Sequence, residues 1–307
     1  MFLKMMKLSV QTAPILDNYG IDAGFGMIAD AGFDCVDFNI DHALPGSAIR
    51  AGKNEGFFDK TDAELLEALR PYAEAAKKHG VGFGQAHAPF PSYIHDAPKT
   101  NAYVLNAIKK CMMMLGEVGC PWIVVHPAFN AYSDRLTAEE EWKINEEMYS
   151  ALIPTIRETG VKVATENMFS SYKKKIIEAV MSDFNFAADF VDHMNEIAGE
   201  KLFGYCLDVG HATLLHRDQR KVINTLGERI TVLHLHDNDG QSDQHLFPYE
   251  GITDWDAVCA GLKDVGYKGT LSFETFNGIA TRADGLAPEL LKLLGSIGRQ
   301  FAAKIEG

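Results

Sequence analysis

The sequence predicts an α/β protein of the (β/α)8 (TIM) barrel class, built as a single domain over residues 1–307. Short apolar segments alternate with longer amphipathic ones from end to end, and eight segments of each kind can be distinguished. Six of the short segments end in His, Asp or Glu. Dividing 307 residues by eight gives roughly 38 residues for each strand–helix unit, which suits a barrel with some longer loops.

The predicted strands are short runs of apolar and β-branched residues. In chain order they are 7–12, 35–40, 81–87, 122–126, 162–166, 203–208, 230–236 and 270–274. The helical patterns between and after them are 23–31, 61–79, 100–118, 138–159, 184–197, 217–226, 255–265 and 288–305. Thr61 and Glu64 form a capping-box pattern, and Gly80 follows the same helix. No GxGxxG or P-loop pattern supports a doubly wound open sheet.

The charge and composition of the chain argue against some classes of function and indicate a cellular location. Lys plus Arg is 29 and Asp plus Glu is 42, so the formal net charge of −13 opposes binding to a nucleic acid. The dense basic run Lys173–Lys175 is typical of a solvated loop or helix face. The five scattered cysteines predict buried free thiols in a reducing compartment. We expect a cytoplasmic protein, because neither a signal peptide nor an apolar stretch of membrane-spanning length is visible.

The ends of six strand segments carry residues that bind divalent metals. These are His87, His126, Glu166, Asp208, His234 and Glu274. Active-site residues of parallel barrels lie at the carboxyl ends of the strands, so the pattern predicts a metal site there. Glu166, Asp208, His234 and Glu274 follow one another in the last four strands. Three carboxylates and one imidazole suit a divalent ion such as Mn²⁺, Co²⁺, Mg²⁺ or Zn²⁺.

Further polar residues accompany this set. His211 lies one turn beyond Asp208, and His236 shares a strand face with His234 by alternation. Asp243 and His245 lie in the following loop. In the segment that comes next, Trp255 is predicted to begin a helix with its ring in the core, capped by Thr253 or Asp254.

Several motifs together resemble one family. They are LDVGH at 207–211, HLHDN at 234–238, D-x-H at 243–245 followed by Gly251 and Asp254-Trp255, and SFET at 272–275. This set is similar to the xylose-isomerase-like barrel superfamily, which contains sugar and sugar-phosphate isomerases and epimerases and the endonuclease-four type apurinic-site nucleases.

The isomerase branch implies one metal ion held by Glu166, Asp208, His234 and Glu274. The two glutamates would also act as acid and base on a carbon next to a carbonyl, and the metal would stabilise the resulting enediolate. His211 would hydrogen-bond a substrate oxygen. His87, His126, His236, Asp243 and His245 are then expected to contact the substrate.

The nuclease branch implies another use of the same positions. A three-metal site would take His87, His126, Glu166, Asp208, His211, His234, Asp243, His245 and Glu274 as ligands. The net charge of −13 and the aromatic loops favour a sugar substrate over a duplex. The loop aromatics are Phe57, Phe58, Phe90, Tyr93, Phe129 and Tyr132.

The same pocket also suits a keto-inositol or keto-acid dehydratase, or a sugar-binding barrel without activity. The sequence does not distinguish these two functions from an isomerase, and it leaves open whether the sugar is phosphorylated. We expect a small-molecule sugar or sugar-phosphate partner, no membrane partner and a possible homo-oligomer.

Overall fold

The computed structural model describes residues 5–130, 135–280 and 285–307. Eight parallel strands with helices between them confirm the predicted (β/α)8 barrel class. Neighbouring strands of this sheet follow the order β10-β1-β2-β3-β4-β5-β8-β9. Their bounds are β1 Leu8–Gln11, β2 Cys35–Asn39, β3 Gly82–His87, β4 Trp122–Val124, β5 Lys162–Glu166, β8 Phe203–Asp208, β9 Ile230–His234 and β10 Leu271–Phe273.

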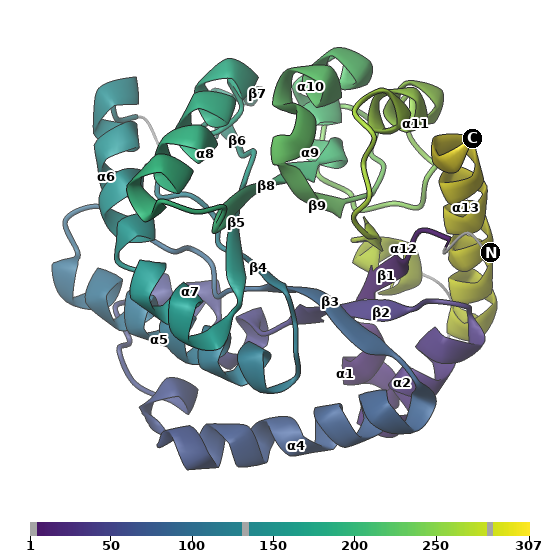
Figure 1. Ribbon diagram of the computed structural model, residues 1–307, viewed down its shortest axis with the longest axis horizontal. Coiled ribbons are helices and arrows are strands. Elements are labelled where there is room, and N and C mark those ends of the chain that lie inside the picture. The colour runs from purple at the N-terminus through teal and green to yellow at the C-terminus, as the bar shows by residue number, and fades with distance from the viewer. Residues whose placement is uncertain (1–4, 131–134, 281–284) are drawn as a thin grey trace. The chain divides into compact units, whose positions relative to one another are not determined.

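Helices follow the strands along the chain (Figure 1). The longer ones are α2 Ile21–Asp30, α4 Asp62–His79, α5 Pro98–Glu117, α6 Ala138–Ser150, α8 Phe184–Ala198, α10 Gln219–Leu226, α11 Trp255–Asp264 and α13 Ala287–Glu306. The shorter ones are α1 Ile15–Tyr19, α3 Gly46–Arg50, α7 Ile153–Thr159, α9 Val209–Leu214 and α12 Phe276–Ala280, with 3-10 turns at Asp41–Ala43, Phe57–Asp59 and Gly227–Arg229.

The chain divides into two compact units, each assembled from separate segments. The first unit contains residues 1–38, 71–84 and 206–307. Within it, β1 pairs in parallel with β10, with Leu8 opposite Leu271, and with β2, with Ser9 opposite Cys35. Helix α13 packs against α2 and α11 in this unit (Figure 1). The ring of Trp255 stacks on Phe301 at a centroid distance of 5.2 Å, as the predicted core position of Trp255 requires.

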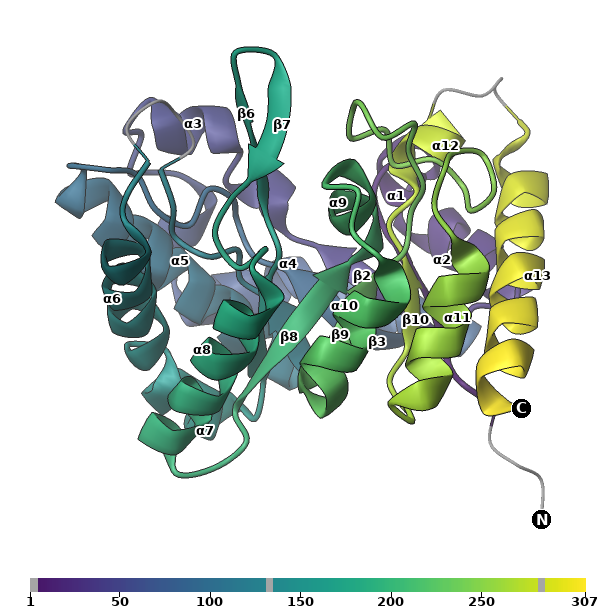
Figure 2. The same cartoon turned by 90° about the horizontal axis from the view of Figure 1, so that it is seen from above.

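The second unit contains residues 39–70 and 85–205. Strand β4 pairs in parallel with β5, with Ile123 opposite Val163. An antiparallel hairpin, β6 Phe169–Tyr172 with β7 Lys175–Glu178, follows β5 and projects beyond α8 (Figure 2). Lys173 and Lys174 form its tip with φ angles of 49° and 63°. The basic run is therefore a hairpin turn, which agrees with the predicted solvated loop.

One predicted helix is wrong in its extent. The pattern over 138–159 predicts a single helix, but the structure has α6 and α7, separated at Ala151 and Leu152. Pro154 lies in the first turn of α7, where the missing backbone N–H costs nothing, whereas a continuous helix would have needed that group. Helix α7 ends at Gly160, whose φ of 72° is the left-handed conformation expected after a helix.

The predicted helix caps and the buried free thiols are confirmed. Thr61 and Glu64 form both hydrogen bonds of the capping box, and the carboxylate of Asp254 accepts the amide of Ala257 at 2.9 Å. All five cysteines are free and buried. In the described part of the chain, no helix is long and apolar enough to cross a membrane.

Candidate functional site

Three of the predicted metal ligands meet in the first unit. Asp208 ends β8, His234 ends β9 and Glu274 directly follows β10. Buried residues precede each of them, so the strands carry these polar side chains into the interior. Nδ1 of His234 lies 3.8 Å from Oδ2 of Asp208 and 3.6 Å from Oε2 of Glu274. Asp208 and His234 are fully buried, and Glu274 is 7% exposed.

These separations fit a shared cation. At 3.6 and 3.8 Å, the imidazole nitrogen and the carboxylate oxygens are too far apart for good hydrogen bonds. Metal–ligand bonds of about 2.1 Å place two ligands of one ion roughly 3.0–3.4 Å apart in octahedral or tetrahedral geometry. A small inward shift of the side chains would give that spacing. The donor set of two carboxylates and one imidazole therefore fits a divalent ion.

Asp37 supports the same ring of His234 from the opposite edge. Its Oδ2 lies 3.5 Å from Nε2 of His234, and both residues are fully buried. A histidine that binds metal through one nitrogen commonly faces a carboxylate with the other, which fixes the ring and raises its basicity. Asp37 was not among the residues predicted from the sequence. The available signal was a charged residue inside the apolar strand Cys35–Ile40, where only a partnered carboxylate is tolerated.

Gln11, at the end of β1, orients Glu274. Its side-chain amide donates a 2.8 Å hydrogen bond to Oε1 of Glu274, and Gln11 is 3% exposed. This leaves Oε2 of Glu274 as the oxygen that faces His234. Gln11 was not predicted either, because an uncharged amide at a strand end carries no metal-binding signal.

His211 and His236 contact Asp208. Oδ1 of Asp208 accepts the backbone amide of His211 at 2.6 Å and so caps α9, while Nε2 of His236 lies 3.1 Å from the carboxylate. Burial alone would raise the pKa of Asp208, but the nearby His211, His236 and His234 outweigh it and hold that pKa well below its usual range. Burial opposes the charged form of His236, but Asp208 prevails and raises its pKa to about 9.

Asp243 and His245 form the outer part of this cluster. Nε2 of His245 lies 3.0 Å from Oδ2 of Asp243, and Nε2 of His211 lies 3.5 Å from the same oxygen. Burial would raise the pKa of Asp243, but hydrogen bonding to His211 and His245 lowers it. The ring of His245 stacks between His236 and Phe276, with centroid distances of 4.0 and 4.1 Å.

A second cluster lies in the second unit. Glu166 ends β5, and its Oε2 is 3.2 Å from Nε2 of His126. His87 ends β3, and its ring centroid is 5.9 Å from that of His126. The ligand atoms of these three residues lie within 4.8 Å of one another, a spacing that could hold a metal ion. Tyr149 donates a 2.7 Å hydrogen bond to the carbonyl of Val125, the residue before His126.

The predicted site residues thus fall into two groups. Asp208, His211, His234, His236, Asp243, His245 and Glu274 gather in the first unit, and His87, His126 and Glu166 gather in the second. The four-ligand set that includes Glu166 stays a prediction from the sequence.

One protein-family profile matches most of the chain. The sequence profile of the xylose isomerase-like TIM barrel family matches residues 25–296. The chain belongs to the xylose isomerase-like TIM barrel family. The resemblance carried by the motifs in 207–275 is therefore confirmed.

Individual relatives within the xylose isomerase-like family are distant. The chain is 25% identical over 268 residues to the uncharacterized protein y4fM of Sinorhizobium fredii, covering 83% of this chain and 81% of that protein. Among solved structures, the 3-keto-D-glucoside 4-epimerase YcjR of E. coli matches with a TM-score of 0.68 at 18% identity over 95% of this chain and 100% of YcjR. The IOLI protein with a bound zinc atom matches with a TM-score of 0.65 at 20% identity over 98% and 96%.

This xylose isomerase-like chain also has a buried anchor that was not predicted from the sequence. Oδ1 of Asp237 accepts the amides of Asn238 and Thr253, and Oδ2 accepts the amide of Tyr249 and the indole N–H of Trp255, all at 2.9–3.0 Å. The side chain closes the loop that carries Asp243 and His245. The HLHDN motif contains Asp237, but nothing local distinguishes an anchor from a ligand.

The loop aromatics divide between two roles. Phe90, Tyr93 and Phe129 line a cavity in the second unit. Phe58 is buried, and its ring packs edge-on against Phe57. These two therefore stabilise their own loop and do not line that cavity. Tyr132 lies outside the described residues.

Proposed function

We propose that the protein is a divalent-metal-dependent isomerase or epimerase that moves a proton next to the carbonyl of a sugar or sugar phosphate. The observation that carries this proposal is His234, whose Nδ1 faces Asp208 and Glu274 while Nε2 faces Asp37. Membership of the xylose isomerase-like family supports it. The names of two matching structures, a keto-glucoside epimerase and a zinc-containing protein, agree with it.

Asp208, His234 and Glu274 would hold the metal ion, with Glu166 as the fourth ligand predicted from the sequence. A bound divalent ion would supply a positive charge that polarises a substrate carbonyl and makes the neighbouring C–H more acidic. Asp37 would keep the ring of His234 in place. Asp208 stays ionised because the surrounding histidines lower its pKa.

The proton transfers are assigned to Glu274 and Glu166. Gln11 holds Oε1 of Glu274 while Oε2 faces His234, so the proton and the metal ion are assigned to Oε2. A carboxylate that is held in one orientation needs little reorganisation when it accepts the proton.

The neighbouring polar residues would bind the substrate. The imidazole of His211, whose Nδ1 lies 3.7 Å from Asp208, would donate a hydrogen bond to a substrate oxygen. His87, His126, His236, Asp243 and His245 would bind or orient the remaining substrate oxygens.

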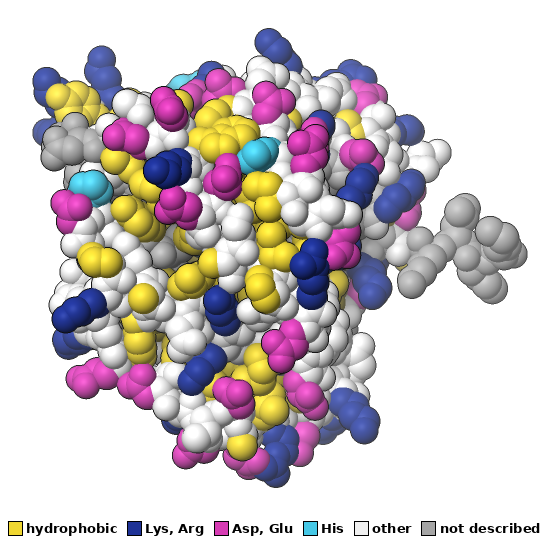
Figure 3. Space-filling view, turned by 60° about the vertical axis from the view of Figure 1, so that its left-hand side comes forward, with side chains coloured by type: hydrophobic (Ala, Val, Ile, Leu, Met, Phe, Trp, Pro, Cys, Tyr) yellow, Lys and Arg dark blue, Asp and Glu magenta, His cyan; other side chains and the backbone are white. Residues whose placement is uncertain are grey.

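One observation favours a second candidate, a multi-metal nuclease. The first unit contains more ligand-type side chains than one ion needs, since Asp208, His211 and His236 form one group and His236, His245 and Glu274 another. The net charge of −13 opposes binding of a nucleic acid and so opposes this candidate. Basic and acidic side chains alternate over the described part of the face in Figure 3, and neither sign forms a continuous stripe there.

Metal content and proton exchange test the proposal together. We expect one tightly bound divalent ion per chain by elemental analysis. With that ion restored after chelation, incubation with ketoses and keto-glycosides in D₂O should place deuterium on the carbon next to the carbonyl and yield an epimer or isomer. Deuterium uptake with loss of water would instead indicate a dehydratase.

Two results would overturn the proposal. Two or three zinc ions per chain, together with cleavage of an oligonucleotide that contains an abasic site, would assign the nuclease function. Tight binding of one sugar without any deuterium exchange would assign a binding protein. Glu274→Gln serves as the inactive control, because it removes the carboxylate while keeping its shape.

A further inference from the structure

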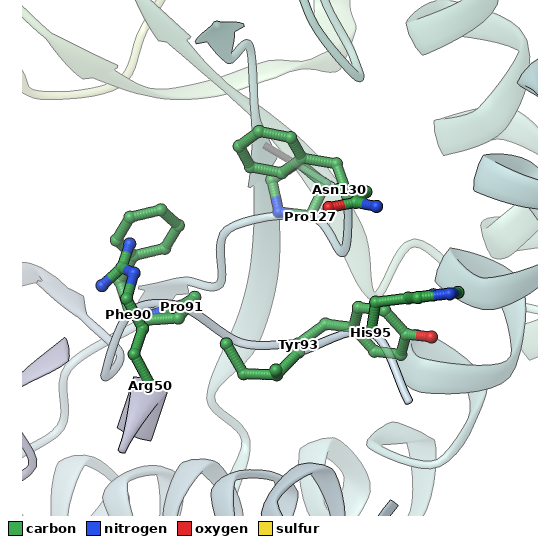
Figure 4. Close-up of a pocket in the computed structure, with 9 residues that line it drawn as sticks. Arg50, Phe90, Pro91, Tyr93, His95, Pro127 and Asn130 are labelled. Carbon is green, nitrogen blue, oxygen red and sulfur yellow. The ribbon is translucent and has the colours of Figure 1, made fainter. Parts of the chain in front are cut away.

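A cavity of about 290 Å³ lies in the second unit (Figure 4), and its lining residue Pro127 directly follows the candidate residue His126 in the chain. This volume is close to the lower end of the range for small-molecule sites. Arg50 and Phe90 lie together at one end, Tyr93 and His95 at the other, and Pro127 and Asn130 form a third side. The cavity is therefore large enough for a single ring.

The lining is mainly apolar. Among the nine described residues that line it, six are apolar or aromatic: Phe90, Pro91, Tyr93, Ile94, Pro127 and Phe129. The polar lining residues are Arg50, His95 and Asn130. The guanidinium carbon of Arg50 lies 5.7 Å from the centre of the Phe90 ring, so this cation is already engaged by an aromatic face. Flat apolar walls with a few polar groups suit a ring with an apolar face and polar substituents at its edge.

Buried hydrogen bonds hold the walls in place. Asn145 in α6 forms two hydrogen bonds with the backbone of Ala128, at 2.7 and 2.8 Å, between the lining residues Pro127 and Phe129. Asn101 in α5 pairs in the same way with the backbone of Ile94, at 2.8 Å for both bonds. Such side chain–backbone pairs fix the cavity before any ligand enters, which reduces the entropy cost of binding.

The cavity and the candidate site share a wall. The ring of Phe90 lines the cavity and also contacts the ring of His126, with 4.5 Å between the centroids. Oγ of Ser92 donates a 2.6 Å hydrogen bond to the carbonyl of His126. His126 in turn lies 3.2 Å from Glu166. A group attached to a sugar that is bound at His126 would therefore reach the cavity past the edge of one ring.

From this arrangement we infer that the cavity is a subsite for a ring-shaped apolar substituent on the substrate, such as the aromatic aglycone of a glycoside. The inference rests on the proposed function and specifies its substrate class: a substituted sugar is preferred over a free monosaccharide. A phosphate is the less suitable occupant, because Arg50 is the only lysine or arginine among the described residues that line the cavity.

Binding of unreactive probes tests the subsite separately from catalysis. Calorimetry on the metal-loaded protein would compare 4-nitrophenyl and methyl D-glucopyranosides, both as α and β anomers. We expect at least one nitrophenyl anomer to bind roughly tenfold more tightly than its methyl counterpart, as expected for one buried aromatic contact. Equal affinities for both anomer pairs would overturn the inference.

Matched variants test whether the preference for the nitrophenyl glycoside arises in the cavity. Phe129→Ala and Tyr93→Ala should abolish the preference for the nitrophenyl group, with circular dichroism confirming that the variants fold. Phe57→Ala removes a loop aromatic that does not line the cavity, and it should keep the preference. If both cavity variants fold and keep the preference, the inference is wrong.

Two further outcomes distinguish the aglycone subsite from a phosphate site and from the proposed epimerase activity. Tighter binding of glucose 6-phosphate than of either glycoside, lost in Arg50→Ala, would assign a phosphate site and overturn the aglycone subsite. A nitrophenyl preference that depends on Phe129, without deuterium exchange on any keto sugar, would keep the subsite and reject only the proposed epimerase activity.

Discussion

At the scale of a single residue, the carboxylate of Glu274 has two differently placed oxygens. One oxygen is fixed by Gln11, and the other faces His234. We predict that Glu274→Gln lowers kcat at least 10³-fold, because an amide cannot accept the proton. The far-ultraviolet circular dichroism should match the parent protein. Turnover within tenfold of the parent would show that Glu274 is not an acid or base.

Asp37 is a positioning residue, since it faces the metal candidate His234 from behind. Asp37→Asn removes the charge and keeps the shape. We predict a decrease in metal affinity of about 10–100-fold, the usual effect of losing such a partner. Titration of the chelated protein with Zn²⁺ or Mn²⁺ measures it directly. Asp34→Asn is the control, because Asp34 is near the surface and pairs with Arg299. An unchanged metal affinity in Asp37→Asn would remove Asp37 from the site.

At the scale of elements, Gly210 of α9 packs directly against His236, which follows β9. A Cβ atom added at Gly210 would lie only 1.9 Å from Cε1 of His236, so the ring would have to move away from Asp208. We predict that Gly210→Ala lowers metal affinity and activity together. Gly82→Ala is the matched control, because the nearest atoms to its new Cβ lie at 3.8 Å. Normal metal affinity in Gly210→Ala would contradict the predicted displacement of His236.

The loop after β9 depends on Asp237 in a comparable way. Asp237→Asn would replace one acceptor oxygen by a donor, and buried N–H groups such as those of Tyr249 and Trp255 would lose a partner. Each such loss costs about 1–3 kcal/mol, so we predict a decrease in the free energy of unfolding of about 2–4 kcal/mol. Urea denaturation measures this quantity. Asp256→Asn, which changes a carboxylate that is 83% exposed, should leave the denaturation midpoint unchanged. An unchanged midpoint in Asp237→Asn would show that the loop has another anchor.

At the scale of the whole molecule, several carboxylates are buried within one fold of net charge −13. A bound cation would offset part of the cost of burying them. We therefore predict that chelation lowers the melting temperature, and that a metal concentration of one hundred times Kd restores about 2.7 kcal/mol of stability. Differential scanning calorimetry with and without chelator measures the change. Identical melting temperatures would exclude tight metal binding by the folded state.

Strand bounds and the residue types at strand ends depend on short stretches of sequence, and they were predictable from it. Hydrophobic periodicity placed β5 and β8 at the bounds that the structure has, 162–166 and 203–208. Strand ends that carry His, Asp or Glu predicted a shared site for Asp208, His234 and Glu274, and the structure brings these three side chains close together. The division of 138–159 into two helices was not predicted, because the apolar pattern continues through the break and only Pro154 marks it.

The tertiary structure decides which polar side chains orient one another through hydrogen bonds and close contacts. Gln11 and Glu274 are 263 residues apart, and their hydrogen bond exists only because β1 and β10 are neighbours in the sheet. Asp37 likewise reaches His234 only through the fold. The cavity next to Pro127 is made by the end of α3 and by two loops, and the sequence could not distinguish the aromatic residues of these loops from Phe57 and Phe58. Local patterns encode which residue types stand at strand ends, whereas support, burial and cavity shape arise from contacts between segments that are distant in sequence.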